Sequence, residues 1–177
     1  GQLDSPLWEK FCEMIDDTAH WVVASVNPDA CEKLKTAISI TSPDAFITVL
    51  QNSMLPIESD IQAVEQVGTD RLLAALAVTA IAPHSKPAII IDSGTAVTVD
   101  VISPHGTFAG GVIMPGSALI ARALNEGTAQ LPQVFLDQNN APSPIGKNTQ
   151  EAISAGIFWG LVGSINELVR QQRLLLG

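Results

Sequence analysis

The turn Asp92-Ser93-Gly94-Thr95 concentrates groups that can bind phosphate. It follows the apolar residues 89–91 and precedes alternating small apolar residues and threonines, a pattern that predicts a buried strand, a tight turn and a second strand. The turn offers backbone N–H groups, two hydroxyls and a carboxylate, which are the groups that a metal-bound phosphate requires. Asp92 could hold a cation, Gly94 permits close backbone approach, and Thr95 could donate to a phosphate oxygen. The alternative is an ordinary hairpin whose aspartate caps the turn.

A second segment, Gly68-Thr69-Asp70-Arg71, sets an acid beside a base at the start of an apolar stretch. The helix dipole favours an acid in a first helical turn, whereas an arginine there opposes the dipole and is harder to explain structurally. Asp70 could accept a proton from a substrate hydroxyl, and Arg71 could hold a carboxylate in bidentate fashion. Taken alone, the segment fits a structural role as well as a functional one.

Two further segments could present backbone N–H groups to a ligand. The paired glycines Gly110-Gly111 indicate that something approaches a strand closely, and the helix start after Pro115 supplies unpaired N–H groups. A plain strand-to-helix turn is the alternative. Gly146-Lys147-Asn148-Thr149 resembles the end of a P-loop, but residues 141–143 lack the matching glycine, so a Walker motif is rejected. Thr149 could still reach a ligand from its helix start.

Alternating strands and helices must position these segments, and their order predicts an α/β fold. The expected strands cover residues 21–26, 46–50, 89–91, 96–100 and 108–113. The expected helices start at Ser5-Pro6, Asn27-Pro28, Thr69, Ser117 and Asn148. Glu151, three residues after Asn148, completes a capping box for the last helix.

Glycines and prolines indicate how these elements are separated and packed. Pro83-His84-Ser85-Lys86-Pro87 is the best lobe boundary in the chain, which divides it into residues 1–84 and 85–177. Gly156, Gly160 and Gly163 lie near one face of the last helix, and we interpret them as sites of close packing against a neighbouring element.

Composition excludes several classes of function. A net charge of -9 over 177 residues argues against sequence-independent binding to nucleic acid. No run of about 18 residues lacks a polar residue, so no membrane span is expected, and the opening residues carry no basic or apolar signal pattern. Cys12 and Cys31 are expected as free buried thiols, from which we expect a cytoplasmic setting. The three histidines have no metal-ligand spacing.

Taken together and in this order, the segments resemble type III pantothenate kinase, the family that also contains the Bvg accessory factor proteins. The matching pieces are Gly68-Thr69-Asp70-Arg71, Asp92-Ser93-Gly94-Thr95-Ala96 with Thr98 and Asp100, Gly110-Gly111-Val112-Ile113-Met114-Pro115-Gly116, Thr128-Ala129-Gln130-Leu131-Pro132 and Asn148-Thr149-Gln150-Glu151-Ala152-Ile153. Residues 24–28 also look like the family's strand before its second helix. The resemblance covers nearly the whole chain.

The resemblance implies an actin-like fold of the acetate-and-sugar-kinase type, built from two ribonuclease-H-like lobes. It implies ATP-dependent phosphorylation of pantothenate to 4′-phosphopantothenate in coenzyme A biosynthesis, by a cytoplasmic homodimer. Asp70 is implied as the proton acceptor and Asp92 as the ligand of a monovalent cation, K⁺ or NH₄⁺. The residues implied to contact substrates are Gly68, Thr69, Asp70, Arg71 and Thr149 for pantothenate, and Ser93, Gly94 and Thr95 for ATP with Mg²⁺. Thr149 could make its contact across a dimer interface.

The chain departs from the family pattern at three places. The family opens with an Asp-x-Gly-Asn-Thr phosphate loop and closes with a Thr-Gly-Gly turn, and this sequence contains neither. We therefore expect a two-lobe fold with its first strands and its C-terminal end missing, and a chain prone to association through the last helix. The chain also has no tyrosine, which the family commonly places before its Gly-x-Asp-Arg. The alternatives are a non-catalytic or regulatory family member that binds a small ligand or protein partner, and another kinase or an exopolyphosphatase of the same superfamily.

Overall fold

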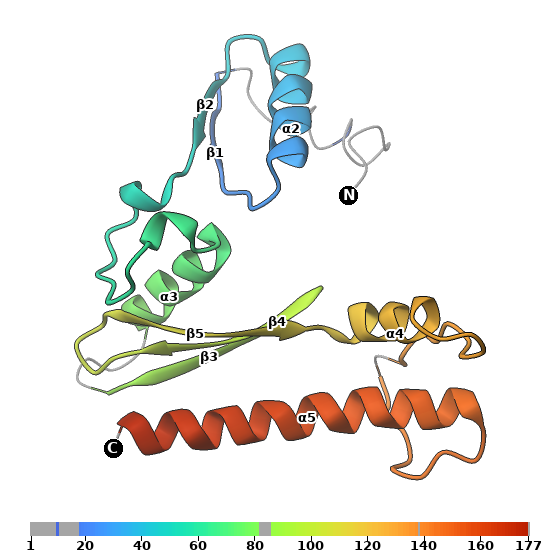
Figure 1. Ribbon diagram of the computed structural model, residues 1–177. Coiled ribbons are helices and arrows are strands. Elements are labelled where there is room, and N and C mark those ends of the chain that lie inside the picture. Colours follow the sequence, from blue (N-terminus) through green and yellow to red (C-terminus); the bar gives the residue numbers. More distant parts are fainter. Residues whose placement is uncertain (1–9, 11–17, 82–85, 138, 177) are drawn as a thin grey trace. The chain divides into compact units, whose positions relative to one another are not determined.

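Strands and helices alternate in the computed structural model, which confirms the predicted α/β class (Figure 1). The structure describes residues 10, 18–81, 86–137 and 139–176. The helix predicted at Ser5-Pro6, Cys12 and the predicted boundary between residues 84 and 85 lie outside the described residues. The chain divides into two units, Gly1–Ile57 with Gln62–Ala77 and Glu58–Ile61 with Val78–Gly177.

A parallel pair of strands joined by a helix opens the first unit. β1 (His20–Val23) pairs with β2 (Phe46–Val49), and α2 (Pro28–Thr41) connects them. Asn27 caps α2 as predicted, because its Oδ1 accepts the Ala30 N–H at 3.0 Å and Pro28 takes the first helical position. Cys31 is buried and unpaired, as predicted.

The first strand ends earlier than the predicted 21–26. Ser25 Oγ accepts the Asn27 N–H at 3.1 Å and donates to the Asn27 carbonyl at 2.9 Å. These bonds fold the chain into a turn before α2, because a serine hydroxyl competes with strand pairing for the backbone groups. β1 therefore stops at Val23.

An irregular segment follows β2 and leads into the third helix. It contains two short 3₁₀ turns, η1 (Asn52–Met54) and η2 (Val64–Gln66), and the predicted helix is α3 (Thr69–Ile81). Leu72 and Ala75 are fully buried, while Ile81 at the helix end is exposed. Burial of α3 is therefore one-sided, less complete than its composition suggests.

The second unit is built on an antiparallel sheet of order β3-β4-β5. The predicted hairpin is β3 (Ala88–Ser93) and β4 (Ala96–Ile102), and the third strand is β5 (Phe108–Pro115). Val97 and Val99 on β4 are buried on one face of the sheet, and Asp100 is buried on the other. The sheet thus has an apolar face and a face with polar side chains.

Two helices complete the second unit. α4 (Ser117–Glu126) follows β5, and the predicted loop leads to α5 (Thr149–Leu176), which runs along the sheet in Figure 1. Ala121, Val134, Ile153 and Ile157 form a buried cluster between α4, the loop and α5. At the far end of α5, Gln172 Nε2 donates to the Val99 carbonyl at 3.0 Å, which ties the helix to β4.

The predicted close packing at the α5 glycines is wrong within this chain. Among the described residues, a Cβ placed on Gly156, Gly160 or Gly163 meets no atom within 4 Å apart from the nearby backbone of α5 itself. The spacing of these glycines leaves open space along the helix instead of a tight contact.

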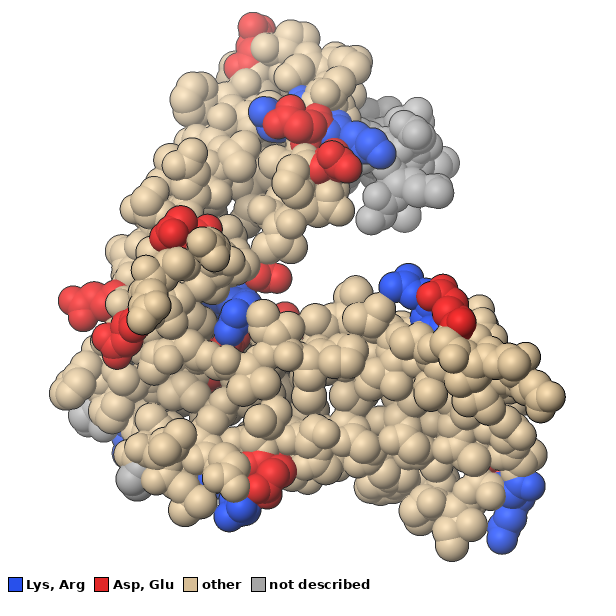
Figure 2. All heavy atoms as spheres, viewed as in Figure 1, with Lys and Arg blue, Asp and Glu red and all other residues tan. Residues whose placement is uncertain are grey.

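Charged side chains are sparse over α4 and α5 in the view of Figure 2.

α5 is also long and apolar enough to cross a membrane by length and composition, with 17% of its most apolar window buried. One such helix is weak evidence for a membrane span, because helices of soluble proteins pass the same test. Glu167 and Arg170 form an ion pair on α5 with a shortest N–O distance of 2.7 Å.

Candidate functional site

Asp70 lies exposed in the first turn of α3 with one carboxylate oxygen fixed. Its Oδ1 accepts the Arg71 N–H at 2.9 Å, and that N–H also donates to the Gly68 carbonyl at 3.1 Å. Among the described residues, Asp70 Oδ2 has no hydrogen-bond partner. A carboxylate held at one oxygen and open at the other can accept a proton from a bound hydroxyl.

Gly68 makes room for the Asp70 carboxylate. A Cβ at Gly68 would overlap Asp70 Oδ1, while its contact with Val26 Cγ1, at 3.6 Å, would be ordinary. Glycine at this position is therefore explained by close approach of a side chain, not by a positive φ, because the described glycines with positive φ are Gly106 and Gly110.

Asn52 fastens the segment that carries Asp70. Its Nδ2 donates to the Val64 and Val67 carbonyls at 2.8 and 2.7 Å, and its Oδ1 accepts the Thr69 hydroxyl at 2.8 Å. Sequence reasoning missed this residue, because its partners are 12 to 17 positions away and two of them are backbone carbonyls. A cavity of about 310 Å³ beside it is lined by Gln51, Asn52, Ser53, Glu65, Val67 and Thr69.

The turn between β3 and β4 forms as predicted. The Gly94 N–H donates to the Ala96 carbonyl at 2.9 Å and closes the turn. Ser93, Gly94 and Thr95 are exposed, so the hydroxyls of Ser93 and Thr95 are accessible to a ligand.

Asp92 and Thr98 are register partners on β3 and β4, so their side chains project from the same face of the sheet. Asp92 is exposed, while Thr98 Oγ1 is buried and has no hydrogen-bond partner among the described residues. A carboxylate beside an unsatisfied hydroxyl oxygen suits a hard cation. No group of three or more His, Cys, Asp or Glu side chains gathers in the described part of the chain, so a closed protein cage for a divalent metal is absent from it.

The structure brings the hairpin turn against the start of α4, two segments that the sequence treats separately. The Gly116 N–H donates to the Thr95 carbonyl at 2.9 Å, and a Cβ at Gly116 would overlap the Gly94 carbonyl oxygen. Gly116 is also the N-cap of α4 and provides no side-chain cap. The first N–H groups of α4 therefore lack a capping side chain beside a turn that carries two hydroxyls, an arrangement suited to an anion.

Thr149 is the first residue of α5, and the predicted capping box holds it there. Glu151 N–H donates to Asn148 Oδ1 at 2.9 Å, and Glu151 accepts from Asn148 Nδ2 at 2.8 Å and from the Lys147 N–H at 2.7 Å. A Cβ at Gly146 would overlap the Ala152 backbone nitrogen, so the loop lies directly on the first turn. Thr149 is exposed.

Thr149 faces an apolar groove of about 630 Å³ between α4 and α5. The groove is lined by Met114, Pro115, Ile120, Leu124, Leu131, Thr149, Ala152, Ile153, Gly156, Ile157, Gly160, Leu161 and Ser164. Within the second unit, therefore, Thr149 shares a groove with Pro115, the residue before the α4 cap.

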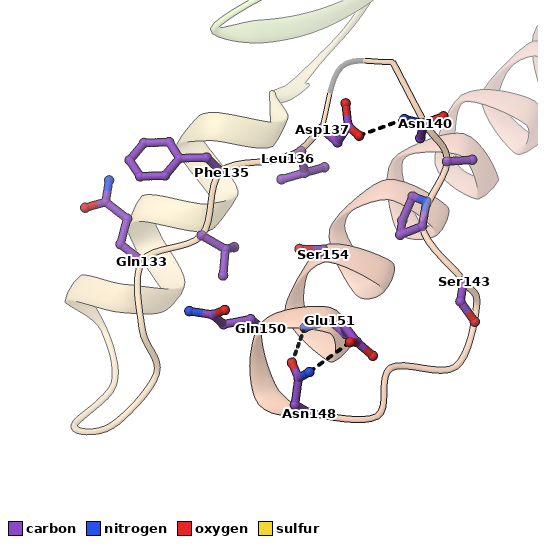
Figure 3. Close-up of a pocket in the computed structure, with 13 residues that line it drawn as sticks. Gln133, Phe135, Leu136, Asp137, Asn140, Ser143, Asn148, Gln150, Glu151 and Ser154 are labelled. Carbon is purple, nitrogen blue, oxygen red and sulfur yellow. Dashed lines mark hydrogen bonds between the residues drawn. The ribbon is translucent and has the colours of Figure 1, made fainter.

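A larger hollow of about 730 Å³ lies on another side of the α5 start (Figure 3). Its described lining includes Asp137 and Glu151 and no Lys, Arg or His. Asn140 Nδ2 and the Asn139 N–H donate to Asp137 and hold the pKa of that carboxyl below its usual value, so it remains charged at neutral pH. Two carboxylates in a lining without Lys, Arg or His repel an anionic substrate, so this hollow is a poor site for a nucleotide or a carboxylate.

The comparisons with known proteins agree on one family. The family model for type III pantothenate kinase matches residues 2–171. The chain is 32% identical to the type III pantothenate kinase of Caulobacter vibrioides over 148 residues, covering 84% of this chain and 56% of that protein. It is 37% identical to that of Chlorobaculum tepidum over 150 residues (83% and 53%) and 38% identical to that of Akkermansia muciniphila over 156 residues (88% and 61%).

The chain thus spans between 53% and 61% of the length of these relatives. Because the family match covers nearly all of its residues and each relative aligns with most of it, the chain belongs to the type III pantothenate kinase family.

Proposed function

We propose that the protein containing this chain transfers the γ-phosphate of ATP to the 4′-hydroxyl of pantothenate, in coenzyme A biosynthesis. The observation that carries the proposal is Asp70, an exposed carboxylate with one oxygen fixed by the Arg71 N–H and the other open. Its position in a Gly-Thr-Asp-Arg segment, within a chain of this family, supports a role as proton acceptor.

The reaction requires one proton transfer and one displacement at phosphorus. Asp70 Oδ2 accepts the proton of the pantothenate hydroxyl as the hydroxyl oxygen forms a bond to the γ-phosphorus. The bond from that phosphorus to the β–γ bridging oxygen breaks, and ADP leaves. Because phosphoryl transfer depends mainly on positioning and charge stabilisation, a single well-placed carboxylate is sufficient base.

Pantothenate is a carboxylate with hydroxyl groups, which matches the chemistry around Asp70. The Arg71 guanidinium can pair with the carboxylate in a bidentate manner, and Gly68 and Thr69 line the same turn. Thr149, which lines the α4–α5 groove, is proposed as a further residue that contacts pantothenate.

ATP is assigned to the corner formed by Ser93, Gly94, Thr95 and the start of α4. The unpaired N–H groups and the helix dipole favour the phosphates there. Mg²⁺ accompanies the nucleotide and neutralises its charge. Asp92, with the Thr98 hydroxyl beside it, would hold K⁺ or NH₄⁺, whose positive charge supports phosphate binding.

The proposal extends to the whole protein. The protein has an actin-like fold with two ribonuclease-H-like lobes, and the proposed lobe boundary lies between residues 84 and 85. The protein is a cytoplasmic homodimer that associates through α5.

A coupled assay with pantothenate, ATP, Mg²⁺ and K⁺ tests the proposal. Asp70→Asn keeps an oxygen for the Arg71 N–H but cannot accept the proton, so kcat should fall by about 10²- to 10⁴-fold. Asp44→Asn changes another exposed aspartate of the first unit and should leave kcat unchanged.

Other outcomes would contradict the proposal in different ways. Equal turnover by Asp70→Asn and the unchanged protein would exclude Asp70 as the base. Pantothenate binding in calorimetry without turnover would indicate a non-catalytic member of the family.

A further inference from the structure

The carboxamide of Asn52 makes three hydrogen bonds to the segment that precedes Asp70. Both Nδ2 hydrogens are used, by the Val64 carbonyl at 2.8 Å and the Val67 carbonyl at 2.7 Å. Oδ1 accepts the Thr69 hydroxyl at 2.8 Å. Asn52 is partly buried, so these bonds are shielded from competing water and are stronger than exposed ones.

We propose that Asn52 is a positioning residue for Asp70 in the phosphoryl transfer proposed above. Its contacts run from η2 to Thr69, the residue directly before Asp70. They fix the entry of the chain into α3, and that entry sets where the Asp70 carboxylate points. A misplacement of about 1 Å in reacting groups can lower the rate by about 10²-fold. The three hydrogen bonds of Asn52 therefore affect the rate of the reaction through the position of Asp70.

Asparagine is the residue type that these contacts require. Two carbonyls need two N–H donors and the Thr69 hydroxyl needs an acceptor, and a carboxamide supplies both from one side chain. Aspartate at position 52 would keep the acceptor but place negative charge against the Val64 and Val67 carbonyls. The proposal therefore predicts that Asn52→Asp, although nearly isosteric, displaces the α3 entry.

The Thr69 hydroxyl offers a second, independent test of the same network. Thr69→Val keeps the shape and removes the donor to Asn52, while Thr69→Ser keeps the donor and removes only a methyl group. Rescue by serine but not by valine would distinguish loss of this hydrogen bond from a loss of packing.

The experiment measures kcat at saturating pantothenate and ATP in the full protein that contains this chain. Asn52→Asp and Thr69→Val should each lower kcat by about 10-fold or more, and Thr69→Ser should lower kcat less than Thr69→Val does. Because Asn52 acts through Asp70, the double variant Asn52→Asp/Asp70→Asn should be no slower than Asp70→Asn alone. Thermal unfolding identifies any variant that fails to fold.

Hydrogen exchange tests the positioning without any turnover. The Arg71 amide hydrogen, bonded to Asp70 Oδ1 and the Gly68 carbonyl, should exchange at least about 10-fold faster in Asn52→Asp, while the α2 amides keep their rates. Full kcat in Asn52→Asp, additive losses in the double variant, or an unchanged Arg71 exchange rate would overturn the proposal. If the unchanged protein shows no kinase turnover, the proposed function is contradicted. If Asn52→Asp still shows the faster Arg71 exchange in that case, the positioning of Asp70 by Asn52 remains supported.

Discussion

At the scale of single residues, Gly68 and Asp70 depend on each other. Asp70 Oδ1 occupies the space where a Cβ of residue 68 would lie, and the Arg71 N–H holds it there. The contact involves the tip of a side chain, which can swing away at low cost. Substitution at Gly68 should therefore move the carboxylate and leave the fold intact.

Gly68→Ala should lower kcat by about 10-fold or more with little change in the unfolding temperature, because it displaces the base without burying a void or a charge. Steady-state kinetics and thermal unfolding measure the two effects. Gly163→Ala is the matched control, since a Cβ there meets no atom within 4 Å, and its kcat should be unchanged. A fully active Gly68→Ala variant would count against Asp70 as the base.

Residue type and spacing were enough to name Asp70, Asp92 and Thr149 as candidates, because acids and hydroxyls at element ends can contact a ligand, although caps and the helix dipole explain the same residue types. The same reasoning could not find Asn52. Its importance comes from two backbone carbonyls and a hydroxyl that the fold brings to it, and carbonyls have no signature in the sequence.

At the scale of elements, the junction of β5 and α4 fixes the shape of the hairpin turn. Gly116 donates to the Thr95 carbonyl, and a Cβ at Gly116 would lie 2.7 Å from that carbonyl oxygen and overlap the Gly94 oxygen. Both obstacles are backbone atoms, which cannot move as a side-chain tip can. The two elements must separate if residue 116 is larger than glycine.

Gly116→Ala should destabilise the protein by about 1–3 kcal/mol, the usual cost of overpacking, and should raise the KM for ATP. Gly94→Ala is the control for stability. A Cβ there would lie 3.9 Å from the nearest atom, so the free energy of unfolding should change by no more than about 0.5 kcal/mol. Denaturant unfolding and ATP titration measure both quantities. Equal stability of the two variants would refute the contact between turn and helix.

Sequence patterns predicted most of these elements, because caps and periodicity are local. Asn27 and Asn148 both cap helices where expected. The α5 glycines were misread, because spacing shows that they share a face but not what lies opposite. In this chain the opposite side is open.

At the scale of the whole molecule, the groove between α4 and α5 is an apolar surface. The groove of about 630 Å³ between α4 and α5 is lined mostly by aliphatic residues and glycines. An exposed apolar patch of this kind marks an interaction surface in soluble proteins. A second copy of the chain is the occupant that we propose, since the exposed glycines let a partner helix approach closely.

Two glycines of α5 provide a matched test of this dimer. Gly160 and Gly163 are both exposed with open space around them, but Gly160 lines the groove and Gly163 does not. A charge at position 160 would be buried without a partner in the dimer. Gly160→Asp should therefore weaken the dimer at least about 100-fold, while Gly163→Asp, with the same cost to the helix, should leave it unchanged.

Sedimentation over a range of protein concentrations measures the dimer dissociation constant of each variant. Because Thr149 lines the same groove, Gly160→Asp should also raise the KM for pantothenate at concentrations where it is monomeric, and high protein concentration should reverse part of that loss. A monomeric unchanged protein would exclude the dimer. If both substitutions weaken the dimer equally, the interface lies elsewhere on α5. If the KM for pantothenate does not depend on protein concentration, Thr149 does not contact pantothenate across the dimer interface.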